Sequence, residues 1–258
     1  MFLPDYPLVF YPIAVVAVLL TGISKGGFGA GASGLSVPLM SILITPAEAA
    51  GIMLPILCAM DLFTAHAYRG RWSVTHLKNL LPGCIFGIAL GGIAFGLLSA
   101  NAVRLLIGGI AVAFAVNKWF ALGERMARFV SSPERSADRA AGGICGLLAG
   151  FTSTLAHAGG PPFAVYILSQ KLDKTLIVAT SAAFFLVCNY TKLIPYYFLG
   201  QLNADNLATS LYFSPLAPLG VWLGVWLHRR NSERVFFQVS YALLFASGVK
   251  LIYDALVR

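Results

Sequence analysis

Long stretches without charge dominate the pattern of this chain. The apolar, charge-poor runs are 79–103, 105–117, 140–170, 175–191 and 206–227. Several are long enough for a helix of ~20 residues that crosses the hydrocarbon core of a membrane. Spans of this kind must be helical, because lipid offers no partner for unpaired backbone groups. The pattern therefore predicts an all-α, polytopic membrane protein.

Composition agrees with this class. Of the 258 residues, 58% are hydrophobic and only 11% are charged, whereas a soluble domain carries about 25% charged residues. The net charge of +8 requires no nucleic-acid partner, because cytoplasmic loops of membrane proteins collect Lys and Arg. The cysteines lie in apolar runs without metal-binding spacing, which predicts inert buried thiols with no disulfide, metal or cofactor. They are Cys58, Cys84, Cys145 and Cys188.

The two halves of the chain follow one plan. Each opens with a short apolar run broken by a glycine-rich patch, "GISKGGFGAGASGLSVP" at 22–38 and "GFTSTLAHAGGPP" at 150–162. After each patch come a long span, a short loop and two further spans. Such internal repetition predicts a first membrane repeat at 1–120, a cytoplasmic linker at 121–139 and a second membrane repeat at 140–258.

The basic residues predict how the chain is threaded, because Lys and Arg concentrate on the cytoplasmic side. If each glycine-broken region crossed the membrane once, the basic clusters at 171–174 and 229–234 would both lie outside. If each broken region instead enters and returns to the same side, every basic cluster lies inside. We therefore predict a broken re-entrant helix pair plus three transmembrane helices in each repeat. Three is an odd number, so the repeats are inverted and both termini lie outside, a design common in secondary transporters.

The two breaks are candidate walls of a substrate site near the membrane midplane. Irregular backbone is tolerated at that depth where it lines a cavity, and a helix that starts after a break directs N–H groups and a positive dipole end towards it. Lys25 adds a full charge beside the first break, and Asn189 and Lys192 share one face of a later span. The predicted substrate-binding residues are Lys25, Gly26, Gly27, Phe28, Gly29, Gly31, Ser33, Ser153, Thr154, His157, Gly159, Gly160, Asn189 and Lys192.

Two titratable groups, His157 and Asp61, are the candidates for proton coupling. Each candidate also has a purely structural interpretation. Lys25 can extend to the membrane interface, His157 can make an interhelical hydrogen bond, and Asp61 can neutralise Lys25 or Lys192. The glycines of the breaks can serve as packing surfaces between helices.

The two patches resemble the TauE/SafE sulfite-exporter family of bacterial permeases. The resemblance rests on "GISKGGFGAGASGLSVPLM", on its counterpart "GFTSTLAHAGGPPFAVYILSQKL" and on the pairing of two such halves, and it covers nearly the whole chain. It implies a multi-pass protein of the bacterial inner (plasma) membrane that transports small sulfur-containing anions such as sulfite or organosulfonates, usually by export. The hydroxyls, the Asn189 amide, and the Lys25 and Lys192 ammonium groups are donors that suit such an anion.

The leading hypothesis is a secondary transporter that alternates access around a midplane anion site, with sulfite or a sulfoacetate-like organosulfonate as cargo. The alternatives are an anion channel and an uptake permease for a different small organic anion, such as a carboxylate. An enzyme is not expected, because the chain has no Walker A, GxSxG or HExxH motif. The expected partners are the small anionic substrate, the lipid bilayer and protons if transport is coupled. The oligomeric state, a homodimer included, is left open.

Overall fold

The computed structural model describes residues 6–28, 34–120, 135–230 and 234–257, and every regular element in these ranges is a helix. Six helices (α1, α3, α4, α5, α9 and α12) have stretches long and apolar enough to cross a membrane, and α10 with α11, bent by 45°, brings the number to seven. This confirms the prediction of an all-α, polytopic membrane protein. The helices are α1 Phe10–Phe28, α2 Ser36–Met40, α3 Pro46–Ala67, α4 Val74–Leu97, α5 Ala100–Trp119, α7 Arg135–Ala156, α8 Gly160–Ser169, α9 Lys174–Phe198, α10 Ala204–Phe213, α11 Leu216–Arg229 and α12 Arg234–Val257.

Polar residues fix where the two central helices, α3 and α9, begin. At α3, the Thr45 hydroxyl accepts from the backbone N–H of Glu48 at 3.3 Å, and the Glu48 carboxylate accepts from the Thr45 N–H at 2.9 Å. At α9, the Asp173 carboxylate accepts from the N–H of Leu176 at 3.0 Å. Both caps satisfy N–H groups that have no partner in the first turn of a helix.

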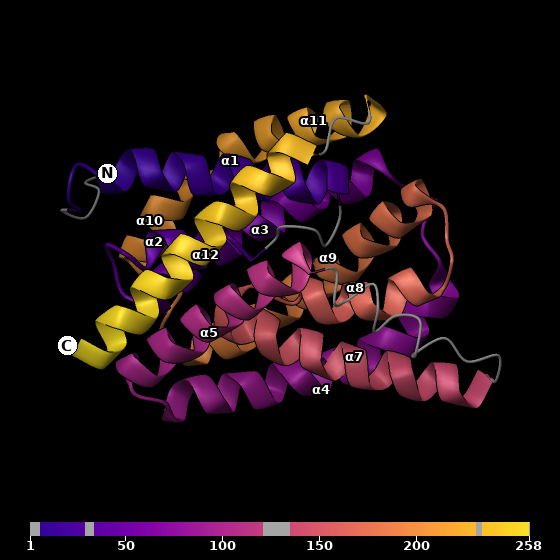
Figure 1. Cartoon of the computed structure of the whole chain (residues 1–258), viewed down its shortest axis with the longest axis horizontal. Helices are drawn as coiled ribbons and strands as arrows, with labels where there is room; N and C mark the ends of the chain where they lie inside the picture. Colours follow the sequence, from indigo (N-terminus) through magenta and orange to yellow (C-terminus); the bar gives the residue numbers. More distant parts are fainter. Residues whose placement is uncertain (1–5, 29–33, 121–134, 231–233, 258) are drawn as a thin grey trace.

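Each half contains a helix followed by a short one, α1 with α2 and α7 with α8. The second break is fully described: the backbone turns at His157, whose φ is 51°, before α8 starts at Gly160. Pro161 and Pro162 occupy the first turn of α8, where a missing N–H costs nothing. Figure 1 shows α8 leading back towards the end of the molecule at which α7 starts. Re-entrant threading and inverted repeats stay predictions.

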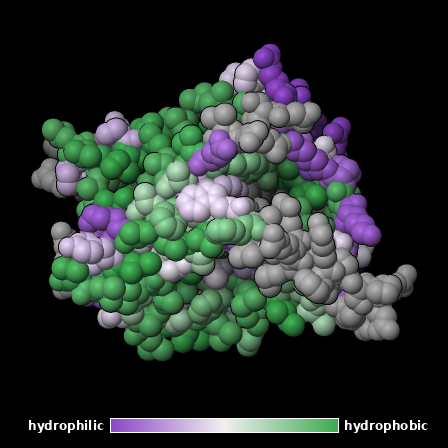
Figure 2. All heavy atoms as spheres, in the orientation of Figure 1, coloured by the Kyte–Doolittle hydropathy of each residue, from purple (hydrophilic) through white to green (hydrophobic). Residues whose placement is uncertain are grey.

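The basic connections gather at one end of the molecule. Figure 1 places the α3–α4 and α8–α9 connections and the end of α11 at the right, whereas both termini lie at the left. The exposed residues of these connections include Arg69, Arg71, Lys171 and Arg230. In Figure 2, hydrophobic atoms cover most of the visible face and the largest group of hydrophilic atoms lies at the same right-hand end. Which end faces the cytoplasm stays a prediction.

The halves pack through reciprocal helix pairs. The first helix of each half lies along a later helix of the other half, α1 along α11 and α7 along α4, and α5 lies along α12. Glycines allow the backbones of the first two pairs to touch. A Cβ added at Gly26 would stand 2.3 Å from the carbonyl oxygen of Val221, and one at Gly87 would stand 2.1 Å from that of Leu147. Small residues of this kind mark close helix contacts in membranes. Helices α3 and α9 meet between these pairs.

Candidate anion-binding site

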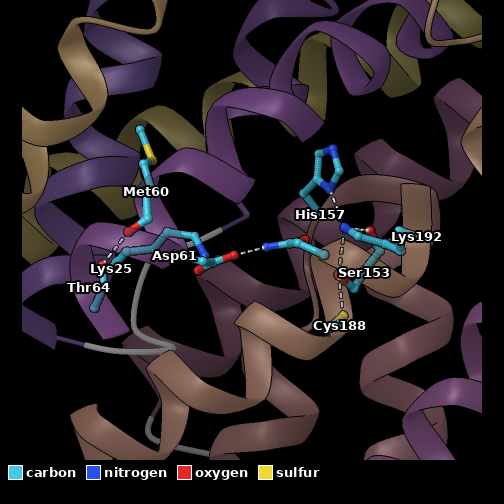
Figure 3. Close-up of polar contacts among 9 residues, drawn as sticks. Lys25, Met60, Asp61, Thr64, Ser153, His157, Cys188 and Lys192 are labelled. Carbon is cyan, nitrogen blue, oxygen red and sulfur yellow. Dashed lines mark hydrogen bonds and ion pairs between the residues drawn. The ribbon is translucent and has the colours of Figure 1, made fainter. Parts of the chain in front are cut away.

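A cluster of buried polar side chains lies where α1, α3, α7 and α9 come together. Lys192 is fully buried, and Lys25, Asp61, Asn189 and His157 are each no more than 5% exposed. Figure 3 shows Lys25 and Asp61 on one side of the cluster, and Ser153, His157 and Lys192 on the other. Ionisable groups at such depth are costly and are functional candidates by default.

The first side of the cluster is an electrically balanced triad. The Lys25 ammonium on α1 donates to one oxygen of the Asp61 carboxylate on α3 and forms a buried ion pair with it. The other carboxylate oxygen accepts from the Asn189 side-chain amide on α9 at 2.6 Å. The Lys25 ammonium also lies 5.4 Å from the centre of the Phe185 ring. The charge of Lys25 is therefore already neutralised by a residue of its own half.

The second side of the cluster centres on Lys192 and lacks such a balance. Its ammonium donates to the Ser153 carbonyl oxygen at 3.0 Å, to the Ser153 hydroxyl at 3.0 Å and to His157 Nδ1 at 2.6 Å. Three acceptors around Nζ match the three N–H donors of an ammonium group. All three acceptors are neutral, and within the described part of the chain Lys192 makes no ion pair. It is a buried cation without a counter-charge of its own.

His157 holds its ring in one orientation because both nitrogens have partners. Its Nε2 lies 3.1 Å from the carbonyl oxygen of Ala50 on α3. A carbonyl only accepts, so this contact assigns the proton to Nε2 and leaves the Nδ1 lone pair to accept from Lys192. The ring also lies against that of Tyr196, with centroids 5.9 Å apart. His157 thus joins the second break to α3 and to α9.

Ser153 and Thr154 use their polar groups differently. The Ser153 hydroxyl accepts from Lys192 and also from the Cys188 thiol, at 3.4 Å. The Thr154 hydroxyl donates to the Gly150 carbonyl within its own helix at 2.9 Å. Thr154 therefore faces the cluster only through its backbone, whose carbonyl accepts from the Tyr196 hydroxyl at 2.7 Å.

The family model described as "Sulfite exporter TauE/SafE" matches residues 14–251. The chain belongs to this family. No curated protein and no solved structure matches the chain. TauE/SafE membership and the membrane-spanning helices together make the chain a multi-pass membrane transporter protein with a small anion as its substrate class. The whole buried cluster lies within the matched region.

In this TauE/SafE chain the described residues predicted at the first break have two roles: Gly26, Gly27 and Phe28 pack against other helices, and Lys25 enters the buried cluster. Gly26 and Gly27 pack against α11, where a Cβ at Gly27 would stand 2.4 Å from the Gly224 carbonyl oxygen. The Phe28 ring lies 5.0 Å from that of Phe237 on α12. Of these residues, only Lys25 reaches the buried cluster. Gly29, Gly31 and Ser33 lie outside the described residues.

At the second break, Gly159 and Gly160 form the N-terminal end of α8. A Cβ at Gly159 would stand 2.7 Å from the Ala149 carbonyl oxygen, so the break packs tightly against α7. Pro161 and Pro162 have no N–H, which leaves α8 with fewer free donors than a typical first turn. The lysine side chain, rather than the helix end, is the main positive group at this break.

Sequence reasoning did not single out two tyrosines that complete the site. Tyr68, which directly follows α3, donates to the Gly26 carbonyl at 2.8 Å, and Tyr196 on α9 donates to the Thr154 carbonyl at 2.7 Å. In both cases the partner lies 42 residues earlier in the chain. Asp61 and Asn189, which contact each other, are 128 residues apart, and so are the two tyrosines. A constant separation of this size between the two halves was the signal available in the sequence.

Proposed function

We propose that this TauE/SafE protein is a secondary transporter that exports small sulfur-containing anions across the bacterial inner membrane. The cargo is sulfite or a small organosulfonate. The observation that carries the proposal is the buried ammonium of Lys192, which is held by three neutral acceptors and, among the residues that the structure describes, by no carboxylate. A buried charge without a partner costs several kcal/mol, and a bound anion would remove that cost.

Lys192, Ser153 and Asn189 supply the donors in this proposal. A sulfur oxyanion offers several acceptor oxygens, and an anionic acceptor forms stronger hydrogen bonds with an ammonium than a neutral one does. Cargo oxygens therefore replace the Ser153 and His157 acceptors around Lys192 Nζ. The Ser153 hydroxyl, released from Lys192, turns to donate to the same anion. Lys25 has a different role, since Asp61 already neutralises it.

Exchange of acceptors at Lys192 also suggests how access alternates. Helix α9 bonds to α3 through Asn189 and to α7 through Lys192. An anion that takes over Lys192 weakens the bonds between α9 and α7 and leaves those between α9 and α3 intact. The broken pair α7–α8 is then held to α9 by fewer bonds, the bond from the Tyr196 hydroxyl to the Thr154 carbonyl among them. In this proposal the pair α1–α2 makes the corresponding movement at the opposite face of the membrane. The reciprocal packing of the halves and their matched tyrosine bonds support this two-fold scheme of inverted, re-entrant repeats.

The direction and coupling follow from charge. A negative-inside potential favours exit of an anion by about 2.3 kcal/mol per charge per 100 mV, so export needs no further energy source. Proton coupling, where present, is assigned to His157 and Asp61. His157 is the first candidate, because its Nδ1 becomes free to bind a proton when the cargo takes its place on Lys192. Asp61 has the same opportunity whenever Lys25 leaves it.

Solute flux in proteoliposomes tests the proposal. The purified chain is reconstituted in vesicles loaded with unlabelled methanesulfonate and assayed for counterflow of the labelled anion. We expect saturable counterflow in the wild type, its loss in Lys192→Met and its retention in Lys250→Met. Lys250 is the matched control because it is a half-exposed lysine paired with Asp254 on α12. Non-saturable flux without counterflow would indicate a channel in place of a transporter. Selective counterflow of acetate would indicate that the cargo is a carboxylate.

A further inference from the structure

The charges of the buried cluster can be counted, and the count defines the charge of the cargo. Among the described residues, the buried charged side chains are Lys25, Asp61, Lys192 and Asp254. Asp254 lies outside the cluster and pairs with Lys250 at 2.5 Å. His157 holds a single ring proton on Nε2 in this hydrogen-bond arrangement and is neutral. Lys25 and Asp61 cancel, so the cluster carries one net positive charge, that of Lys192.

The constant separation between the halves explains why the count is one. Asn189 is the counterpart of Asp61, 128 residues later in the chain, and the two side chains touch at 2.6 Å. At the same separation Ser153 is the counterpart of Lys25, so the ion pair of the first half is replaced by two neutral side chains in the second half. Lys192, three residues beyond Asn189 on α9, is the counterpart of Thr64, so the second half adds one positive charge that the first half lacks. The cargo supplies the negative charge that this added lysine lacks among the described residues.

We propose that the transported species carries a single negative charge, and that the Lys25–Asp61 pair sets this preference without touching the cargo. This inference rests on the proposed function and narrows its substrate class to monoanions, such as hydrogensulfite or a simple alkanesulfonate. A dianion would leave one negative charge uncompensated in a buried site, at a cost of several kcal/mol. Sulfate and sulfoacetate, which are dianions, are therefore poorer ligands than methanesulfonate, which is a monoanion of similar head-group chemistry.

Four variants of the cluster separate net charge from direct contact. Lys25→Met and Lys192→Met each lower the net charge to zero. Asp61→Asn raises it to two. The double variant Lys25→Met/Asp61→Asn removes the ion pair and keeps the net charge at one. If charge decides binding, the double variant binds methanesulfonate as the wild type does, although it lacks the lysine that the first glycine patch brings into the site.

The test is to measure, by isothermal titration calorimetry, the equilibrium binding of methanesulfonate and of sulfate to the purified chain in nanodiscs. We expect the wild type and the double variant to bind methanesulfonate more tightly than sulfate by about tenfold or more, because an uncompensated buried charge is costly. Lys25→Met should lose methanesulfonate binding with Lys192 intact, and Asp61→Asn should shift the preference towards sulfate. The double variant keeps the test decisive if Asp61→Asn does not fold.

Three results would overturn the inference. The first is wild-type binding of sulfate as tight as that of methanesulfonate. The second is loss of methanesulfonate binding in the folded double variant, which would make Lys25 a direct ligand. The third is unchanged methanesulfonate binding in Lys25→Met. Failure of the proposed function gives a different pattern, in which the wild type binds neither sulfur anion, and that pattern overturns both proposals together.

Discussion

Removal of the Asp61 carboxylate is the perturbation with the largest expected effect on stability. Asp61→Asn leaves the Lys25 ammonium, which is only 5% exposed, beside a neutral amide oxygen in place of the carboxylate, with the Phe185 ring 5.4 Å away. Breaking a buried ion pair by removing one partner costs about 3–5 kcal/mol, whereas removing both partners is often close to neutral. For a chain of this size, each kcal/mol of lost unfolding free energy lowers the melting temperature by about 2–4 °C. We therefore expect Asp61→Asn to melt roughly 6–20 °C below the wild type.

A double-mutant cycle turns this expectation into a test. The melting temperatures of the wild type, Asp61→Asn, Lys25→Met and the double variant are measured in one detergent by intrinsic tryptophan fluorescence. The double variant should melt closer to the wild type than Asp61→Asn does, because it leaves no unpaired lysine. If the melting temperature of the double variant falls by the sum of the two single-variant decreases, Lys25 and Asp61 do not interact. That result would refute the balanced triad on which the charge count depends.

Three further changes test other parts of the site. Gly87→Val should destabilise the α4–α7 contact by at least about 1–3 kcal/mol, since overpacking costs that much. Its control is Gly109→Ala, which has open space around it and should stabilise α5 by about 0.5–1 kcal/mol. Equal melting temperatures for the two variants would contradict the close contact between α4 and α7. Tyr196→Phe leaves a buried carbonyl unpaired and should lower stability by about 1–3 kcal/mol, which denaturation in the presence of lipid would measure. His157→Gly relieves a positive φ but removes an acceptor from Lys192, so we expect greater stability than in His157→Ala with equal loss of counterflow; restored counterflow in the glycine variant would exclude a role for the imidazole.

The class of fold was predictable because it depends on local composition. Charge-poor runs require only the chain itself, and they indicated the membrane helices. The sequence left two possible ion-pair partners for Asp61, Lys25 and Lys192, because both carry the same charge. Only the packing of α1 beside α3, and of α9 against α7, decides between the two lysines.

The roles within the glycine patches were harder to predict. A glycine that lines a cavity and a glycine that touches another helix give the same sequence signal. Gly26 and Gly27 face α11 because that helix carries its own small residues, Gly220 and Gly224, in register with them. Tyr68 and Tyr196 were missed for a related reason. Each lies at the far end of its span, and only the tertiary fold brings its hydroxyl to the carbonyl of a broken helix.

The most direct test of the central claim is to locate a bound anion in an experimental structure. Selenite is a heavier analogue of sulfite, and its anomalous scattering marks its position in crystals of the full-length protein. We predict a selenium peak beside Lys192, with an oxyanion oxygen about 2.7–3.2 Å from its Nζ and with the Lys25–Asp61 pair still closed. A peak coordinated by Lys25, with Lys192 still bonded to Ser153 and His157, would contradict the account.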